Sequence, residues 1–459
     1  MNSAPRRLDV PPAVLRQLAV SHPRRYPALL DSAVAGPLGK VTILAAQPQA
    51  ALWTTADGAV HGAGMTPRAP TFLDALQLWW QESAQSPAAG HSQLHAARES
   101  GVPFAPGWVV FVGYEVAADI EPHLTLPRTP LPWTAFALRT PCALVHVLET
   151  DAVWAVAEPG AQTLLDEVVA DAQRQAAAVS AAPEPVGLTF QVTEEDPARY
   201  IQRVLRAKEY IRAGDIYQVN LSRPWHVQPV ADTALLYERL RSRNPAPFAA
   251  LVQWDGVSIL SSSPERLLRV SGRDVDTRPI AGTRPRTRRP GEDAPEAAAL
   301  VAHPKERAEH IMLIDLERND LGRVCEAGTV SVNELMVTET YAHVHHIVSN
   351  VRGRLRADVT PIGALKAVFP GGTITGCPKF RCMQIIAELE GEGRGAFYGS
   401  LGYLTPGGDM DLNILIRTMT LERSHITLRT GGGIVADSDP ERELNETRAK
   451  ARGMLAVFT

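Results

Sequence analysis

Residues 249–262 read Ala-Ala-Leu-Val-Gln-Trp-Asp-Gly-Val-Ser-Ile-Leu-Ser-Ser and contain two short apolar runs, 249–254 and 258–262, which we predict to be β-strands. Further strands are expected at 39–46, 108–113, 216–221, 329–334, 345–352, 399–404, 412–419 and 426–430. Helices are expected at 71–84, 161–178, 197–213, 294–315, 361–368 and 379–390. Strands and helices do not alternate regularly along the chain. This pattern favours an α+β fold over a doubly wound nucleotide-binding fold.

The composition is that of a globular protein. The chain has 459 residues, of which 45% are hydrophobic and 21% are charged, enough to build one large domain or two. The stretch 181–187 is rich in alanine and proline and predicts a linker. We therefore expect an N-terminal region at 1–187 and a C-terminal region at 188–459.

Charge and hydropathy limit the expected partners. The formal net charge is -4 at pH 7, so no overall attraction to nucleic acid is expected. No apolar run approaches the roughly 18 residues that a membrane-spanning helix needs. The four cysteines form no Cys-x-x-Cys pair and fit reduced thiols, and the first ten residues carry no apolar secretion signal. We expect a cytoplasmic protein whose partners are small molecules or proteins.

Two pairs of glutamates share one spacing. Glu306 and Glu309 are three residues apart in a predicted helix, and Glu443 and Glu446 repeat this spacing near the C-terminus. The members of each pair therefore lie on one helix face. Two such pairs could hold a hard, oxygen-seeking cation such as magnesium, with some ligands through water. Solvated helix faces are the other interpretation and, from spacing alone, the more common one.

Glycine-rich segments and one buried charge offer candidate anion sites. Residues 371–376 precede a predicted helix, and residues 431–433 follow a predicted strand. Backbone amides bared by glycine can bind phosphate or carboxylate, but neither segment matches a nucleotide-binding fingerprint. Arg417 lies inside the predicted strand 412–419, where a charge needs an anionic partner. A substrate carboxylate and an internal acid would serve equally well.

Histidines and nucleophile motifs narrow the chemistry further. His345 and His346 are adjacent on a predicted strand and point to opposite faces, which leaves at most one of them for a pocket. No G-x-S-x-G or G-x-C-x-G motif is present. Acyl transfer and glutamine hydrolysis by this chain are therefore not expected.

Motifs of the C-terminal region occur together in a characteristic order. They are Ser263-Pro264-Glu265-Arg266, Pro279-Ile280-Ala281-Gly282-Thr283, the segment 306–320, residues 371–379, residues 431–438 and Glu446-Thr447. In order and spacing, over 190–459, they resemble the chorismate-utilising enzymes, the family of anthranilate, aminodeoxychorismate, isochorismate and salicylate synthases. The resemblance implies an α+β fold of α/β/β/α type, in which two large antiparallel sheets pack orthogonally and both regions of the chain feed the sheets.

The resemblance also implies a site. Glu265 is implied as the general acid that protonates the leaving hydroxyl of chorismate, with His346 near the same hydroxyl. The implied cofactor is magnesium. Glu309 and Glu446 would hold it directly, and Glu306 and Glu443 would act through water. The implied substrate contacts are Ala281, Thr283, Thr373, Tyr398, Arg417, Gly432, Gly433 and Lys450. The segment Leu30-Asp31-Ser32 resembles part of the tryptophan site of the amidotransferase-linked members.

Local residues discriminate among the reactions of the family. Gln218 replaces the lysine with which isochorismate and salicylate synthases activate water, so the resemblance implies ammonia as the nucleophile, supplied by a glutamine amidotransferase subunit in a heterodimer. The stretches 217–221 (Tyr-Gln-Val-Asn-Leu), 246–248 and 371–376 resemble aminodeoxychorismate synthases, whereas anthranilate synthases more often show Phe-Gln-Val-Val in the first. Ala281 points the other way, because the best-known aminodeoxychorismate synthases carry lysine there and anthranilate synthases carry alanine.

We therefore expect an aminodeoxychorismate synthase of a branch that lacks the lysine and serves para-aminobenzoate and folate biosynthesis. The alternatives are anthranilate synthase component I, in tryptophan biosynthesis, and a catalytically inactive chorismate-binding subunit.

Overall fold

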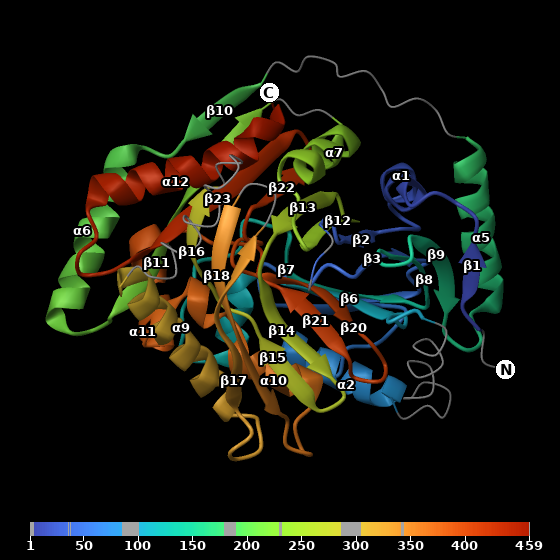
Figure 1. The fold of residues 1–459 in the computed structure, drawn as a ribbon, viewed down its shortest axis with the longest axis horizontal. Helices are drawn as coiled ribbons and strands as arrows, with labels where there is room; N and C mark the ends of the chain where they lie inside the picture. Colours follow the sequence, from blue (N-terminus) through green and yellow to red (C-terminus); the bar gives the residue numbers. More distant parts are fainter. Residues whose placement is uncertain are drawn as a thin grey trace.

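The computed structural model describes residues 4–34, 36, 38–84, 101–178, 190–228, 232–285, 304–340 and 344–458, with the backbone alone at 283–285, 304–306 and 344–345. Two large antiparallel sheets form the centre of the molecule, and helices flank them (Figure 1). The predicted linker at 181–187 and the first residues of the helix predicted at 294–315 lie outside the described residues.

The first sheet takes strands from both regions of the chain. Strand β2 of the N-terminal region pairs with β12 of the C-terminal region, with Ala28 opposite Val252. The hydrogen-bonded order is β1 (Arg6–Leu8), β9 (Ala152–Ala157), β8 (Cys142–Val147), β3 (Val41–Ala46), β2 (Ala28–Asp31), β12 (Phe248–Trp254), β13 (Val257–Ser263), β22 (Thr418–Glu422), β23 (His425–Ile434), β11 (Gln218–Gln228) and β10 (Gln191–Glu194), with β19 (Gly376–Cys377) also on β11.

The second sheet is shared in the same way. Strand β6 of the N-terminal region pairs with β20, with Val112 opposite Ser400. The order is β16 (Ile280–Pro285), β18 (Val344–Arg354), β15 (Asp274–Thr277), β14 (Arg266–Ser271), β21 (Met410–Asn413), β20 (Ser400–Leu404), β6 (Gly107–Val112), β7 (Trp133–Thr140), β4 (Ala50–Thr55) and β5 (Val60–Ala63), with β17 (Ser331–Thr340) also on β18. The regions 1–187 and 188–459 therefore contribute to the same two sheets.

Helix boundaries follow local capping signals. Helix α6 (Pro197–Ala213) begins after Asp196, whose side chain accepts a hydrogen bond from the N–H of Ala198, and it ends at Gly214 in the left-handed conformation. The other helices are α1 (Ala13–Ser21), α2 (Phe72–Ala84), α4 (Ala117–Ile120), α5 (Gln162–Ala177), α7 (Thr233–Arg243), α9 (Pro304–Gly322), α10 (Pro361–Val368), α11 (Lys379–Glu390) and α12 (Pro440–Leu455), with short 3-10 turns η1 (Tyr114–Val116), η2 (Gly372–Ile374) and η3 (Ala456–Phe458). Within the described ranges, no helix is both long and apolar enough to cross a bilayer.

Aromatic side chains from both sheets pack together in the core. Phe111 and Phe136 of the second sheet lie in one buried cluster with Val252 and Ile259 of the first. The ring of Trp254, on β12, lies 4.7 Å from that of Phe136. Burial of such large rings is a main source of folding stability, so this cluster fixes the two sheets against each other.

Several predicted elements differ from the structure in their bounds, as β11, β17 and β23 do by extending beyond the predicted strands, and two further differences are larger. The predicted helix 294–315 is observed as α9, which extends to Gly322. The predicted single strand 412–419 is wrong, because β21 ends at Asn413 and β22 begins at Thr418. Between them the chain passes from the second sheet to the first, and Arg417 takes a left-handed φ of 50°. Arg417 therefore does not lie within a buried strand.

Candidate active site

Two crossings between the sheets lie next to each other. The chain leaves the first sheet at Ser263 and enters the second at Arg266, and residues 414–417 make the reverse crossing. The N–H of Ile414 donates a 3.0 Å hydrogen bond to the carbonyl oxygen of Glu265. This contact sets Glu265 and Arg417, one on each crossing, at the boundary of the two sheets.

Glu265 has the environment of a proton donor. The residue is 5% exposed, and its Oε1 accepts a 3.0 Å hydrogen bond from Oγ1 of Thr373 in η2. Burial raises the pKa of the carboxyl to about 8, against the lowering by the Thr373 hydroxyl, and the negative charge of Glu317 adds to the rise. The carboxyl is therefore protonated at neutral pH, as a general acid must be.

A hydrogen-bonded chain continues from Thr373 to Tyr398. Nδ2 of Asn220 donates to the carbonyl oxygen of Thr373 at 3.0 Å, and the hydroxyl of Tyr398 donates to Oδ1 of Asn220 at 3.4 Å. Tyr398 has a φ of 64°, a conformation that a bulky residue adopts only under constraint and that is frequent at functional sites. Its N–H is held by the carbonyl oxygen of Leu415, on the second crossing.

Helix α12 presents two glutamates to a glycine on β23. A Cβ atom at Gly432 would lie 3.4 Å from Oε2 of Glu443 and 3.7 Å from Oε1 of Glu446. Nζ of Lys450 lies 2.8 Å from Oε1 of Glu446 and donates to the carbonyl oxygen of Gly431 at 2.8 Å. The missing side chain of Gly432 thus leaves the space between strand and carboxylates open.

Tyr398 relates this acidic pair to Glu265. Burial raises the pKa of its phenol above the usual value, and the charges of Glu265 and Glu446 both contribute to the rise. Tyr200, on α6, has a raised pKa through burial first and then through Glu443 and Tyr398. Glu265 and Glu446 therefore both act on the phenol of Tyr398, and Glu443 and Glu446 both act on that of Tyr200.

The residues of the predicted metal site are only partly brought together. Among the residues that the structure describes, no three acidic, histidine or cysteine side chains converge at metal-binding distance. Glu309 lies partly buried on α9, and the side chain of Glu306 is outside the described residues. Glu443 and Glu446 do converge, and their oxygens beside the bare Gly432 fit a hard cation.

Three of the predicted substrate-site residues, Ala281, Thr283 and His346, lie on the paired strands β16 and β18. Ala281 on β16 is opposite Ile347 on β18, and Thr283 is opposite His346. Gly282 lies between Ala281 and Thr283 at a β-bulge, with a φ of 61° that suits glycine. Ala281 and His346 are buried, whereas the side chains of Thr283 and His345 lie outside the described residues.

The segment that resembles a tryptophan site is well ordered by its own contacts. Leu30 and Asp31 lie at the end of β2, and Ser32 follows them. The carboxylate of Asp31 accepts hydrogen bonds from three side chains, Thr42 Oγ1 at 2.9 Å, Tyr237 Oη at 3.1 Å and Arg241 Nε at 2.8 Å. These contacts join β2 to β3 and α7, and binding of tryptophan here stays a prediction.

Sequence reasoning missed a buried network beside the site. Glu390 is fully buried and pairs with Arg394 at 2.6 Å and Arg429 at 3.1 Å, and Arg394 also donates to the carbonyl oxygen of Asn220 at 2.8 Å. The spacing of Glu390 and Arg394, four residues apart, was the available signal.

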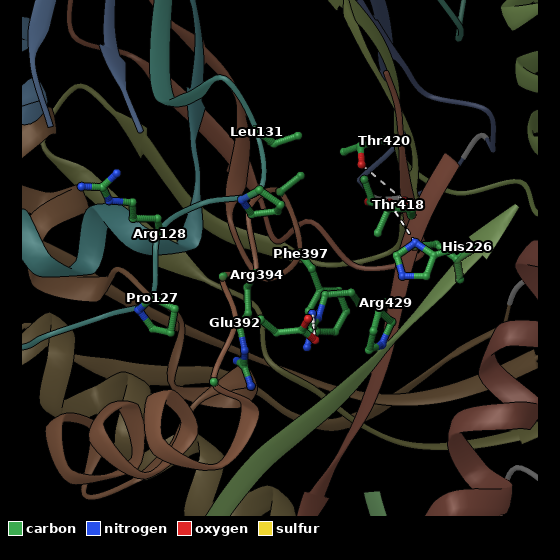
Figure 2. Close-up of a pocket in the computed structure, with 17 residues that line it drawn as sticks. Pro127, Arg128, Leu131, His226, Glu392, Arg394, Phe397, Thr418, Thr420 and Arg429 are labelled. Carbon is green, nitrogen blue, oxygen red and sulfur yellow. Dashed lines mark hydrogen bonds and ion pairs between the residues drawn. The ribbon is translucent and has the colours of Figure 1, made fainter. Parts of the chain in front are cut away.

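A pocket of about 330 Å³ opens beside this network (Figure 2). Figure 2 shows the Arg429–Glu392 pair at its wall and His226 of β11 next to Arg429. None of the residues predicted for the site lines this pocket.

Comparisons with known proteins agree with the fold. A family model described as chorismate binding enzyme matches residues 42–456. An anthranilate synthase component I-like protein of Synechocystis sp. is 42% identical over 362 residues, 78% of this chain and 73% of that protein. An aminodeoxychorismate synthase of Streptomyces pristinaespiralis is 40% identical over 382 residues, 78% of this chain and 52% of that protein. The solved anthranilate synthase component I of Streptococcus pneumoniae matches with a TM-score of 0.77 at 31% identity, over 92% of this chain and 93% of that one.

Proposed function

This chain belongs to the chorismate binding enzyme family, and we propose that within this family it is component I of an aminodeoxychorismate synthase. In the proposed reaction, chorismate and ammonia give 4-amino-4-deoxychorismate, for para-aminobenzoate and folate biosynthesis. The family membership makes it an enzyme acting on chorismate, and the choice of product rests on the residues beside Glu265.

One contact carries the choice of product. Asn220 and Thr373 belong to two of the stretches that resemble aminodeoxychorismate synthases, and Nδ2 of Asn220 donates to the carbonyl oxygen of Thr373. The N–H of Asn220 also donates to the carbonyl oxygen of Thr375 at 2.9 Å. Thr373 in turn holds the carboxyl of Glu265. The valine that is more usual in anthranilate synthases would lack this side-chain amide.

Glu265 supplies the proton that the reaction needs. Chorismate has a ring carboxylate conjugated to a diene and a hydroxyl at ring carbon 4, and hydroxide is a poor leaving group. Glu265 protonates this hydroxyl, which leaves as water while ammonia forms a C–N bond at ring carbon 2 and loses one proton. A second ammonia then forms a C–N bond at carbon 4 and loses one proton, while the amine at carbon 2 takes up one proton and departs as ammonia.

We propose magnesium as the cofactor. Glu309 of α9 and Glu446 of α12 would hold it directly, and Glu306 and Glu443 would act through water. Of these four, Glu443 and Glu446 face Gly432. Bound there, the cation would neutralise the ring carboxylate and withdraw electron density from the diene.

Cations and small residues around these acids are the proposed substrate contacts. Arg417 lies close enough to Glu265 to lower the pKa of its carboxyl, and Lys450 lies beside Gly431. Each could pair with one of the two carboxylates of chorismate. The remaining proposed contacts are Ala281, Thr283, His346, Thr373, Tyr398, Gly432 and Gly433.

The thiols support an external source of ammonia. Glutamine hydrolysis by cysteine needs an activated thiolate with a lowered pKa. Burial raises the pKa of all four thiols of this chain, to about 12 for Cys142 and Cys382 and about 11 for Cys325. We therefore propose that a glutamine amidotransferase subunit delivers ammonia in a heterodimer. Free cysteines throughout are in keeping with the reducing cytoplasm.

Anthranilate synthase component I is the second candidate, and Ala281 is the observation that favours it. The methyl side chain of Ala281 cannot act as the nucleophile that lysine provides in the covalent route of lysine-bearing aminodeoxychorismate synthases. The deciding experiment is identification of the product from chorismate, ammonium and magnesium. Aminodeoxychorismate supports the proposal, anthranilate with pyruvate supports the second candidate, and no turnover supports an inactive chorismate-binding subunit.

A further inference from the structure

A second buried acid lies behind the proposed general acid. Glu317, on α9, is 2% exposed, and its Oε2 accepts a 2.9 Å hydrogen bond from Oγ1 of Thr277 at the end of β15. The N–H of Gly372, the first residue of η2, also donates to this carboxyl. Glu317 therefore joins α9, the second sheet and the start of the turn that carries Thr373.

The turn is fitted closely against α9. A Cβ atom at Gly372 would lie 3.1 Å from Cβ of Leu316 and 3.4 Å from Oε1 of Glu317, so a side chain here would force Leu316 to shift by a few tenths of an ångström. Beyond the turn, Nζ of Lys379, the first residue of α11, lies 2.6 Å from Oδ2 of Asp320 on α9 and donates to the carbonyl oxygen of Val368 at 3.0 Å. The segment 372–379 is thus held to α9 at both ends.

We propose that Glu317 is a positioning residue for Glu265: from α9 it fixes Gly372 and hence Thr373, whose hydroxyl holds the Glu265 carboxyl. The negative charge of Glu317 also favours the protonated form of that carboxyl. The role of Glu265 as the acid rests on the proposed function. The path from Glu317 to Glu265 is continuous in the structure, through Gly372, the next residue Thr373 and a 3.0 Å hydrogen bond.

The charges around the two acids support this assignment. Burial raises the pKa of Glu317 to about 7, Asp320 adds to the rise, and Lys379 opposes it. Burial also raises the pKa of Glu265, to about 8, and the negative charge of Glu317 adds to that rise. Among the described residues, Arg417 also acts on Glu265 and lowers its pKa, and Tyr398 is a neighbouring phenol. Ionised Glu317 opposes the loss of a second proton from the pair.

The test measures the titration of Glu265 directly in the full chain without substrate. Glutamate is labelled with carbon-13 at Cδ, and the resonance of Glu265 is the one that Glu265→Gln removes. Glu317→Gln deletes the charge with little change in volume. Thr277→Val is the second variant, because loss of its hydroxyl makes Glu317 harder to ionise. Glu158→Gln is the matched control, since Glu158 is a largely buried acid paired with Arg139 at 2.5 Å.

We expect the titration midpoint of Glu265 to fall by about one pH unit in Glu317→Gln and in Thr277→Val, and to stay in place in the control. An unchanged midpoint in either folded variant, or an equal fall in Glu158→Gln, overturns the proposal. Because the measurement uses no substrate, it separates the two proposals. If the chain makes anthranilate and the midpoint shifts, only the proposed function is contradicted. If the chain makes aminodeoxychorismate and the midpoint does not shift, only this inference is contradicted.

Discussion

Nζ of Lys450 lies 2.8 Å from Oε1 of Glu446, one turn earlier on helix α12. Both side chains are about half exposed, at 49% and 53%, so the pair contributes little to stability. The ammonium is an exchangeable partner of the carboxylate, and a divalent cation can compete with it. Metal binding at Glu446 and the position of Lys450 should therefore be linked.

The first prediction concerns metal binding by α12. Glu446→Gln should weaken the binding of Mg²⁺ at least roughly tenfold in calorimetric titration, because it removes one of two carboxylates that face Gly432. Glu441→Gln is the control, since Glu441 is an exposed acid in the first turn of the same helix. Equal affinities of the two variants for Mg²⁺ would show that Glu446 is a solvated helix residue and not a metal ligand.

Turnover tests the role of Glu265. Glu265→Gln keeps the size of the side chain and can still accept a hydrogen bond from Thr373, but it has no proton to give to the leaving hydroxyl. We expect turnover of chorismate to fall roughly a hundredfold or more with nearly unchanged substrate affinity. Steady-state kinetics at saturating ammonium give both quantities. A variant with intact turnover and weaker affinity would show that Glu265 only binds.

The same substitution predicts a pH-dependent gain in stability. The pKa of Glu265 rises from an ordinary 4.5 to about 8 on folding, so between these values the folded protein holds a proton that the unfolded chain has released. Stability is therefore lost as pH rises through this window, by up to roughly 1.4 kcal/mol per pH unit. The melting temperature of Glu265→Gln relative to the parent should be higher at pH 8 than at pH 5. Equal differences at both pH values would contradict this sign.

Local signals explain which parts of the fold were predictable. Helix α6 matches its predicted range because an aspartate caps its start and Gly214 its end. The break between strands β21 and β22, which ends at Arg417, was not predictable. Residues 412–416 are all apolar except Asn413 and look like part of one strand. What ends the strand is the passage to the other sheet, held by the contact between Ile414 and the backbone of Glu265, and that contact joins segments distant in sequence.

The site was predictable to a similar degree. Glu265, Glu446 and Gly432 were predicted because motif order resembles a known family, and the structure places the Glu446 carboxylate close to Gly432. Glu317 was in a recognised motif, but its proposed role depends on Thr277, 40 residues away. No periodicity within α9 distinguishes an acid that reaches another strand from one that faces water.

The source of nitrogen gives a further prediction. The purified chain should use ammonium and should not use glutamine, because all four of its thiols have raised pKa values and none is activated for attack. Product formation with each nitrogen donor is measured by chromatography. Addition of a glutamine amidotransferase subunit should restore glutamine-dependent turnover. Rapid glutamine use by the chain alone would contradict the proposed division of labour.

The last prediction follows from Ala281, which is buried on β16 beside β18. A methyl group cannot attack ring carbon 2, so ammonia must do so, and the intermediate should be free 2-amino-2-deoxyisochorismate. Mass spectrometry of protein and products decides among three results. Aminodeoxychorismate without a protein adduct, and with added 2-amino-2-deoxyisochorismate accepted as substrate, agrees with this route.

The other two results would contradict different parts of the proposal, namely the product and the first nucleophile. Anthranilate and pyruvate as main products would mean that the amine at carbon 2 is retained and that elimination replaces the second addition, which promotes the second candidate function. A chorismate-derived adduct on one of the lysines would instead show that a side chain attacks carbon 2 from elsewhere in the site. In that case the product assignment stands, and the inference from the alanine at position 281 to free ammonia at the first step fails.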